Sequence, residues 1–331
     1  MTPRDIIKSH LSFSDPPRIG MEFGGDGRLC DTHWAKYDAG SWVQKRWTEG
    51  RFEYYDDEWG NVWFRVADMG AGGEIYEPAI KDWAQLKDFR LPDLANPARY
   101  EKVKAAFAAD KEHYRVGGLP GFPFAICRYL RKMEIYFQDL LLEREHIDEL
   151  HERVARLLED IMRQYAVAGA DGLFFCEDWG IQDRLLIHPR MWREIYKPIF
   201  TRLCRTAHGL GLSVFMHSCG YNWDIIDDLA EAGIDVLQFD QPGIYGLERL
   251  AEKLQRLKVC LDSPVDIQRV MPTGDRELIV STARKMCRLF GGQHGGFIAR
   301  NYGDLKGIGV RPEWDQWAYD AFLESGADAA V

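Results

Sequence analysis

The segment at 212–220, Leu-Ser-Val-Phe-Met-His-Ser-Cys-Gly, places a histidine and a cysteine directly after an apolar run. The run predicts a buried β-strand, and helix-like segments flank it on both sides. Side chains two residues apart in an extended chain point to the same side, so His217 and Cys219 can converge on one metal ion. The same pair can instead be two buried side chains without a metal, because free cysteine is among the most buried residue types.

Composition restricts the classes of partner that this chain can have. Its 331 residues include 42 basic and 52 acidic side chains, for a net charge of -10, which argues against binding to nucleic acid. The seven cysteines are an odd number without Cys-x-x-Cys spacing, which is typical of reduced thiols in the cytoplasm. The sequence shows neither a hydrophobic signal core nor a run of transmembrane length. We therefore expect a cytoplasmic protein that binds neither nucleic acid nor a membrane.

Predicted strands and helices alternate from residue 114 onward, which indicates parallel βα units. No Gly-x-Gly-x-x-Gly fingerprint follows any strand, which disfavours a nucleotide-binding open sheet. In a (β/α)8 TIM barrel the carboxyl ends of all strands meet at one end, here called the mouth, where chemistry takes place. We predict this barrel because polar residues follow nearly every strand: Glu22, Glu177, Asp178, His217, Asp240, Asp262 and Asn301.

The region at 26–113 does not show the same alternation and is rich in aromatic and acidic residues. Two strand-like runs flank Trp59-Gly60-Asn61-Val62, which predicts a β-hairpin with a Gly-Asn turn. We expect residues 1–331 to form a single barrel domain, with 26–113 as an elaboration at one end.

Several motifs resemble the uroporphyrinogen decarboxylase superfamily, and the resemblance covers roughly residues 15 to 325. The motifs, in chain order, are Gly-Ala-Asp-Gly at 169–172, Asp-Trp-Gly-Ile-Gln at 178–182, Lys197-Pro198, Val-Phe-Met-His-Ser-Cys-Gly at 214–220, and the segment from Gly233 to Gln241-Pro242. The resemblance implies a uroporphyrinogen decarboxylase-like barrel and allows a homodimer.

The resemblance implies one of two chemistries. One branch of the superfamily decarboxylates uroporphyrinogen, but its arginine-bearing N-terminal motif is replaced here by Gly-Met-Glu-Phe-Gly-Gly at 20–25. The other branch transfers methyl groups to or from a corrinoid protein and uses zinc bound by a His-x-Cys pair and a distant cysteine. This chain resembles the second branch more closely, although Asn301 stands where the third cysteine is expected.

The third metal ligand is therefore expected to be a carboxylate. Asp240 follows the next strand and is the first choice, with Glu177 and Cys260 as alternatives. Asp240 can equally be a carboxylate that caps the start of a helix, since acidic residues are favoured there. A site with three protein ligands leaves the open position that catalytic zinc requires.

The predicted function is zinc-dependent methyl transfer between a small methylated compound and a corrinoid protein or thiol acceptor. The alternative is a metal-free decarboxylase or lyase that acts on a smaller acid. In either case Glu177, Asp178 and Asp240 are the candidate catalytic carboxylates, of which Glu177 and Asp178 can also be ion-pair partners of Arg184 or Arg300. Since Glu177 and Asp178 are adjacent, only one can enter the mouth. The candidate substrate-binding residues are Glu22, Trp179, Gln182, Tyr221, Gln241, Asn301 and Tyr302, with Trp179 and Gln182 forming a loop wall.

Overall fold

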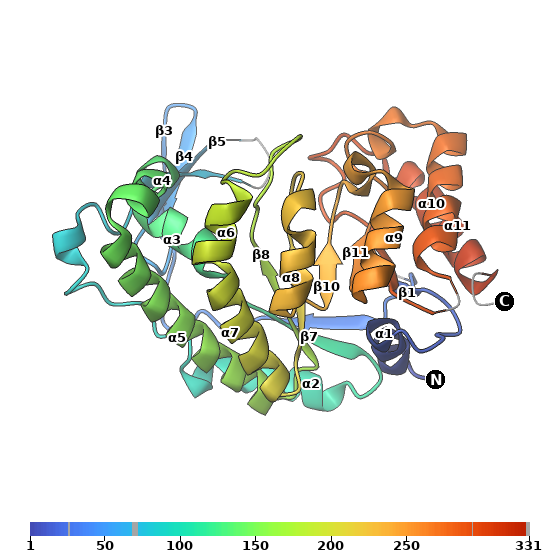
Figure 1. The fold of residues 1–331 in the computed structure, drawn as a ribbon, viewed down its shortest axis with the longest axis horizontal. Helices are drawn as coiled ribbons and strands as arrows, with labels where there is room; N and C mark the ends of the chain where they lie inside the picture. The colour runs from blue at the N-terminus through green and yellow to red at the C-terminus, as the bar shows by residue number, and fades with distance from the viewer. Residues whose placement is uncertain (26, 68–71, 293, 329–331) are drawn as a thin grey trace.

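Eight parallel strands form a nearly closed barrel in the computed structural model (Figure 1), which describes residues 1–25, 27–67, 72–292 and 294–328. The strands are β1 (Gly20–Glu22), β2 (Thr32–Ala35), β7 (Tyr114–Gly118), β8 (Gly172–Cys176), β9 (Ser213–His217), β10 (Val236–Gln238), β11 (Cys260–Ser263) and β12 (Phe297–Arg300). They are hydrogen-bonded in the order β1-β12-β11-β10-β9-β8-β7-β2. An antiparallel bridge from Glu22 to Cys30 connects the two ends of this order. The predicted TIM barrel is confirmed.

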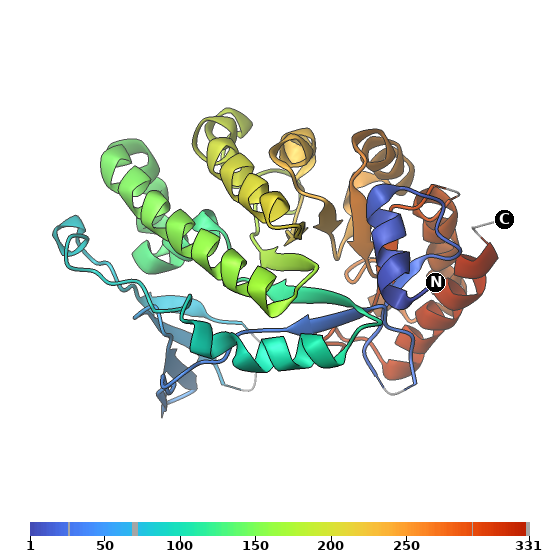
Figure 2. The same cartoon turned by 90° about the horizontal axis from the view of Figure 1, so that it is seen from below.

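Helices cover the outside and one end of the barrel (Figure 2). They are α1 (Pro3–Ser12), α2 (Glu101–Ala109), α3 (Pro123–Arg131), α4 (Met133–Leu142), α5 (Arg144–Ala168), α6 (Pro189–Ile195), α7 (Lys197–Gly209), α8 (Ile226–Ala232), α9 (Leu247–Leu257), α10 (Arg276–Phe290) and α11 (Pro312–Asp328). Neighbouring helices pack side by side, α5 on α7, α7 on α8 and α10 on α11. No helix in the described part of the chain is long and apolar enough to cross a membrane.

Helix α1 closes the end of the barrel opposite the mouth. The helix begins after Thr2, whose side chain accepts a hydrogen bond from the Asp5 amide. Its Ile7 side chain is fully buried and packs into a cluster with residues from five barrel strands: Tyr114, Val116, Phe215, Val236, Cys260 and Ile298. Because side chains fill this end, the interior of the barrel is a packed core, and the chemistry is left to the mouth.

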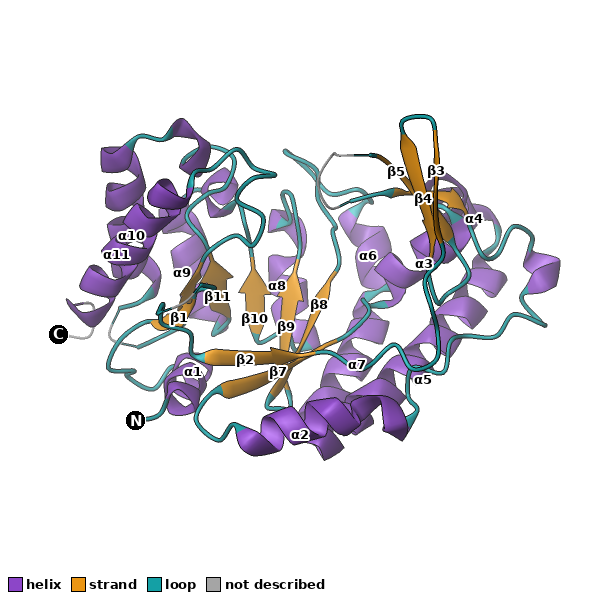
Figure 3. Ribbon diagram, turned by 180° about the vertical axis from the view of Figure 1, so that it is seen from behind, coloured by secondary structure: helices purple, strands orange, loops and turns teal. Residues whose placement is uncertain are grey.

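The elaboration contains a four-stranded antiparallel sheet in the order β3 (Arg46–Glu49), β4 (Phe52–Asp56), β5 (Val62–Val66) and β6 (Glu74–Glu77). Strands β4 and β5 form a hairpin around 57–61, where Asp57 accepts hydrogen bonds from the amides of Trp59 and Asn61. The sheet lies beside α3 and α4 (Figure 3), and the Trp63 ring lies 4.8 Å from the Tyr129 ring of α3. Its position brings polar and aromatic side chains of the elaboration close to the barrel.

Three elements differ from the sequence-based expectation. Strand β2 lies within the region expected to be elaboration, and its four residues are too few for a clear alternation. Helix α11 was not predicted, although its buried Ala318 and Phe322 show helical spacing. The aromatic and polar sequence at 81–89 also predicts a short helix, but the structure forms only a single 3-10 turn there, Trp83–Gln85, which Asp82 caps.

Candidate metal centre

The register of three neighbouring strands builds the site. Strands β8, β9 and β10 end side by side at the mouth (Figure 3), and Cys176, His217 and Gln238 are paired across them. Asp178, Cys219 and Asp240 follow two residues beyond each of these positions. Parallel pairing therefore gathers two layers of polar side chains at the mouth, and each layer has one residue from each of these three strands.

Three of these side chains can hold one metal ion. The candidate ligand atoms of Asp178, His217 and Cys219 all lie within 4.8 Å of one another. The Nε2 atom of His217 lies 3.2 Å from the Cys219 Sγ atom and 3.6 Å from the Asp178 Oδ1 atom. One nitrogen, one sulfur and one carboxylate oxygen form a donor set that suits zinc and leaves a fourth position open. The residues present therefore fit the metal that the sequence predicted.

Gln238 determines which nitrogen of His217 faces this cluster. The His217 Nδ1 atom is hydrogen-bonded to the Gln238 Oε1 atom, and the Gln238 Nε2 atom donates to the Asp240 Oδ1 atom at 2.8 Å. Because the amide oxygen only accepts, Nδ1 carries the proton and Nε2 keeps its lone pair for a metal. Asp240 lies on the Nδ1 side, with its Oδ2 atom 3.9 Å from that nitrogen. Its carboxylate thus orients Gln238, whereas Asp178 lies on the Nε2 side of the ring.

Two glycines allow the loops after β8 and β9 to interlock. A Cβ atom on Gly180 would lie 2.5 Å from the Tyr221 amide nitrogen, and Gly220 has a φ of +78°, which favours glycine. The close approach lets Gly180 donate to the Cys219 carbonyl and Tyr221 donate to the Ile181 carbonyl. In addition, the Cys219 amide donates to the Asp178 Oδ1 atom at 2.8 Å. These backbone contacts hold Asp178 beside Cys219.

The charge around Cys219 is negative. Burial raises the pKa of the Cys219 thiol, and the Asp178 and Asp240 carboxylates raise it further. The thiol is therefore neutral in the absence of a cation. A divalent cation would reverse this effect, since metal binding and deprotonation of a thiol are linked.

A cleft of about 570 Å³ leads from the elaboration to Asp178. Its walls come from two sources, the antiparallel sheet and the segment spanning α3 and α4. The lining residues are Phe64, Gly73, Glu74, Ile75, Arg128, Tyr129, Lys132, Met133, Glu134 and Asp178. The cleft is large enough for a small organic molecule and brings it to one of the candidate ligands.

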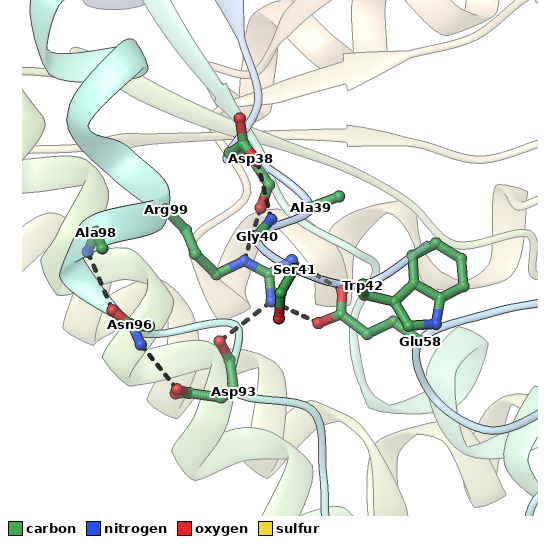
Figure 4. A pocket seen from close by; sticks show the side chains of 10 residues that line it. All are labelled: Asp38, Ala39, Gly40, Ser41, Trp42, Glu58, Asp93, Asn96, Ala98 and Arg99. Atoms are coloured by element: carbon green, nitrogen blue, oxygen red, sulfur yellow. Dashed lines mark hydrogen bonds and ion pairs between the residues drawn. The ribbon is translucent and has the colours of Figure 1, made fainter. Parts of the chain in front are cut away.

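A second pocket, of about 410 Å³, shares no lining residue with this cleft (Figure 4). Arg99 crosses it and forms two contacts with the Glu58 carboxylate, at 2.5 and 2.8 Å. The Arg99 guanidinium also donates to the Asp38 and Asp93 carbonyl oxygens. Because its central charge is already paired, this pocket is a structural junction within the elaboration, between its hairpin and the 3-10 turn Pro97–Tyr100 that precedes α2.

A family model described as uroporphyrinogen decarboxylase (URO-D) matches residues 66–308, which is most of the chain. The chain belongs to the uroporphyrinogen decarboxylase family. No curated protein matches it in a sequence search.

A structure search matches this uroporphyrinogen decarboxylase family member to solved structures at low sequence identity. A methyltransferase from Methanosarcina mazei is 15% identical, with a TM-score of 0.63 over 81% of this chain and 76% of that chain. An endo-β-1,4-xylanase from Gloeophyllum trabeum is 11% identical, with a TM-score of 0.43 over 69% of this chain and 80% of that chain. The first likeness shows the fold alone, and the second is weaker.

The structure corrects two of the predicted roles in this family member. Glu177 is fully buried outside the mouth, where its carboxyl accepts a hydrogen bond from the Ala125 amide at the start of α3. Burial raises the pKa of Glu177 to about 8. Trp179 is also fully buried and stacks on Phe124 with 4.0 Å between ring centroids, so it does not form a wall of the mouth. Asp178, between these two residues, is the one that enters the mouth.

Other predicted residues lie around the mouth without joining the cluster. Glu22 forms an ion pair with Arg300 at 3.0 Å, and Arg300 also pairs with the fully buried Asp262 at 2.9 Å. Asn301 accepts a hydrogen bond from the Gly24 amide, which ties together the loops that follow β12 and β1. Gln182 is exposed in the loop after β8.

The remaining candidates have mixed positions. Burial, Asp240 and Cys219 raise the pKa of Tyr302, which lines a small pocket together with Arg300 and Asp315. Tyr221 stacks on Tyr245, with 5.4 Å between ring centroids, and the buried Gln241 Oε1 atom has no partner among the described residues. Cys260 lies in the packed interior next to α1, so it is not available as a third ligand.

Sequence reasoning missed three residues of this site. Gln238 is a polar residue at the end of an otherwise apolar strand, a signal that could have identified it. Cys176 is a second thiol at the mouth, beside His217 in the strand register. Arg300 was considered only as a partner for Glu177 or Asp178, whereas the structure pairs it with Glu22 and Asp262.

Proposed function

We propose that this protein is a zinc-dependent methyltransferase that moves a methyl group between a small methylated compound and a corrinoid protein or thiol acceptor. The observation that carries the proposal is the Asp178–His217–Cys219 cluster at the mouth of the barrel. Its donor set suits zinc and leaves a position for substrate. Membership of the uroporphyrinogen decarboxylase family and the fold shared with a methyltransferase are consistent with it.

The geometry supports Asp178 as the third ligand in preference to Asp240. Asp178 lies on the Nε2 side of His217, together with Cys219, whereas Asp240 lies on the opposite side and bonds to Gln238. When bound, zinc would act as a Lewis acid that activates a thiol or polarises a leaving oxygen without redox chemistry.

The protein's own residues prepare this chemistry. Gln238 holds the His217 ring in one tautomer, and the interlocked loops hold Asp178 against the Cys219 amide. Tyr302 follows β12 at the mouth of the barrel and has a phenolic proton to donate. Its raised pKa keeps that proton in place, so Tyr302 can hydrogen-bond to a substrate oxygen in the mouth.

Metal analysis of purified variants tests the proposal. The wild type is expected to hold about one zinc ion per chain, and Cys219→Ala and Asp178→Ala are expected to lose it, because each removes one of three ligands. Asp240→Ala is expected to keep zinc with lower affinity, since it removes only a partner of Gln238. Cys260→Ala is the matched control, because its thiol lies in the packed interior.

The result also decides between the two candidate functions. If Asp178→Ala retains zinc in full and Asp240→Ala loses it, the third ligand is Asp240 and not Asp178. A wild type that binds no zinc from solution would refute methyl transfer by this centre. The metal-free decarboxylase or lyase would then be the better interpretation, with Asp178 and Asp240 as its carboxylates.

A further inference from the structure

Arg128 is a buried cation that has no ion-pair partner among the described residues. Its side chain lies on α3, the residue is only 8% exposed, and it lines the cleft that leads to Asp178. One terminal nitrogen donates to the Tyr129 hydroxyl at 3.1 Å, but the Nε atom has no hydrogen-bond partner among the described residues. An unpaired buried charge is costly, so such a group points to a ligand that supplies the missing acceptor.

The surroundings of Arg128 do not neutralise it. The guanidinium lies 5.0 Å from the ring centroids of both Phe124 and Tyr129, so aromatic faces hold it in place. The neighbouring Glu177 carboxyl is directed to the Ala125 amide and forms no ion pair with Arg128. These contacts fix the position of the guanidinium, and its second terminal nitrogen, which has no hydrogen-bond partner among the described residues, is left for a ligand.

The cleft has three distinct parts. Arg128 provides a positive charge, and the half-buried Lys132 adds a second, for which the described residues offer no ion-pair partner. Phe64, Ile75 and Met133 provide apolar surface, and Asp178 connects the cleft to the candidate metal centre. Two further carboxylates, those of Glu74 and Glu134, belong to exposed residues.

We infer that this cleft binds a small organic acid with a flat apolar body, whose carboxylate contacts Arg128 and whose reacting group faces Asp178. The inference rests on the proposed function and names the chemical class of its substrate. A guanidinium matches the planar geometry of a carboxylate and can bind both of its oxygens. The apolar walls favour an organic anion over a fully hydrated inorganic one.

Calorimetric titration with benzoate and with benzamide, its neutral counterpart of the same shape, tests the inference. Both titrations use protein dialysed against EDTA, so the outcome does not depend on a bound metal. The wild type is expected to bind benzoate about tenfold or more tightly than benzamide, because a charge-assisted contact is lost with the amide. Arg128→Met is expected to abolish this preference, and Arg128→Lys to keep part of it.

Arg163→Met is the matched control, since Arg163 lies on the exposed face of α5 and forms an ion pair with Asp160 there. It should keep the full preference for benzoate. Equal binding of benzoate and benzamide by the wild type would overturn the inference, even where Arg128→Met does not fold. An unchanged preference in a folded Arg128→Met protein would overturn it as well. Neither outcome bears on zinc content, so failure here is distinguishable from failure of the proposed function.

Discussion

Replacement of Gln238 by leucine tests whether the second layer of the site controls the metal ligand. In the structure the Gln238 amide accepts from the His217 Nδ1–H group and donates to Asp240 at 2.8 Å. Leucine fills a similar volume but makes neither hydrogen bond. His217 is then free to rotate or to change tautomer, so the Nε2 lone pair is no longer fixed toward Cys219 and Asp178.

Partners of this kind typically contribute ten- to a hundredfold in metal affinity, which is about 1.4 to 2.8 kcal/mol of binding free energy. We expect Gln238→Leu to weaken zinc binding by that amount. Gln238→Glu keeps an acceptor for Nδ1–H but places a carboxylate against Asp240 in place of a donor, so it is expected to bind zinc more tightly than Gln238→Leu without matching the wild type. Competition with a chromophoric zinc chelator at neutral pH measures both affinities.

A control must show that both Gln238 variants are folded without zinc, because loss of a buried hydrogen bond costs about 1 to 3 kcal/mol of stability. Thermal unfolding of the zinc-free proteins checks this. If folded Gln238→Leu protein binds zinc as tightly as the wild type, the hydrogen bond to Nδ1 does not orient His217. The preference for Asp178 over Asp240 would then lose its main support.

Two further predictions concern stability. Burial raises the pKa of Glu177 to about 8 from an ordinary 4.5, so between these values the folded protein holds a proton that the unfolded chain releases. The free energy of unfolding of the wild type should therefore fall by up to about 1.4 kcal/mol per pH unit as the pH rises through this window. Urea unfolding measures this slope, and Glu177→Gln should remove the part that Glu177 contributes. Identical slopes in the two proteins would refute the raised pKa of Glu177. Arg300→Met should destabilise the fold by about 3–5 kcal/mol in the same assay, because Glu22 and Asp262 lose their shared cation; a loss below about 1 kcal/mol would contradict this.

The sequence by itself determined the barrel and the central pair of the site. Alternating strand and helix patterns leave few arrangements for parallel βα units, and polar residues at the strand ends favoured closure into a barrel. The i, i+2 spacing of His217 and Cys219 needed only the geometry of an extended chain, and their ligand atoms lie 3.2 Å apart in the structure.

The third member of the cluster depended on the tertiary structure. Glu177 and Asp178 are adjacent, and the sequence indicates only that they face opposite sides. Strand β8 ends at Cys176, and the loop after it turns against Gly220, which directs Asp178 to the mouth and Glu177 to the start of α3. The choice between two neighbouring carboxylates is therefore made by a loop contact from the next strand.

Contacts between distant segments decided the rest. Gln238 reaches His217 because β9 and β10 pair in one particular register, which strand patterns alone do not specify. The cleft at Arg128 exists because the antiparallel sheet of the elaboration packs beside α3 and α4. Local spacing thus predicted side chains that share one strand, whereas partners on different strands or helices were set by packing, since their distances depend on the whole fold.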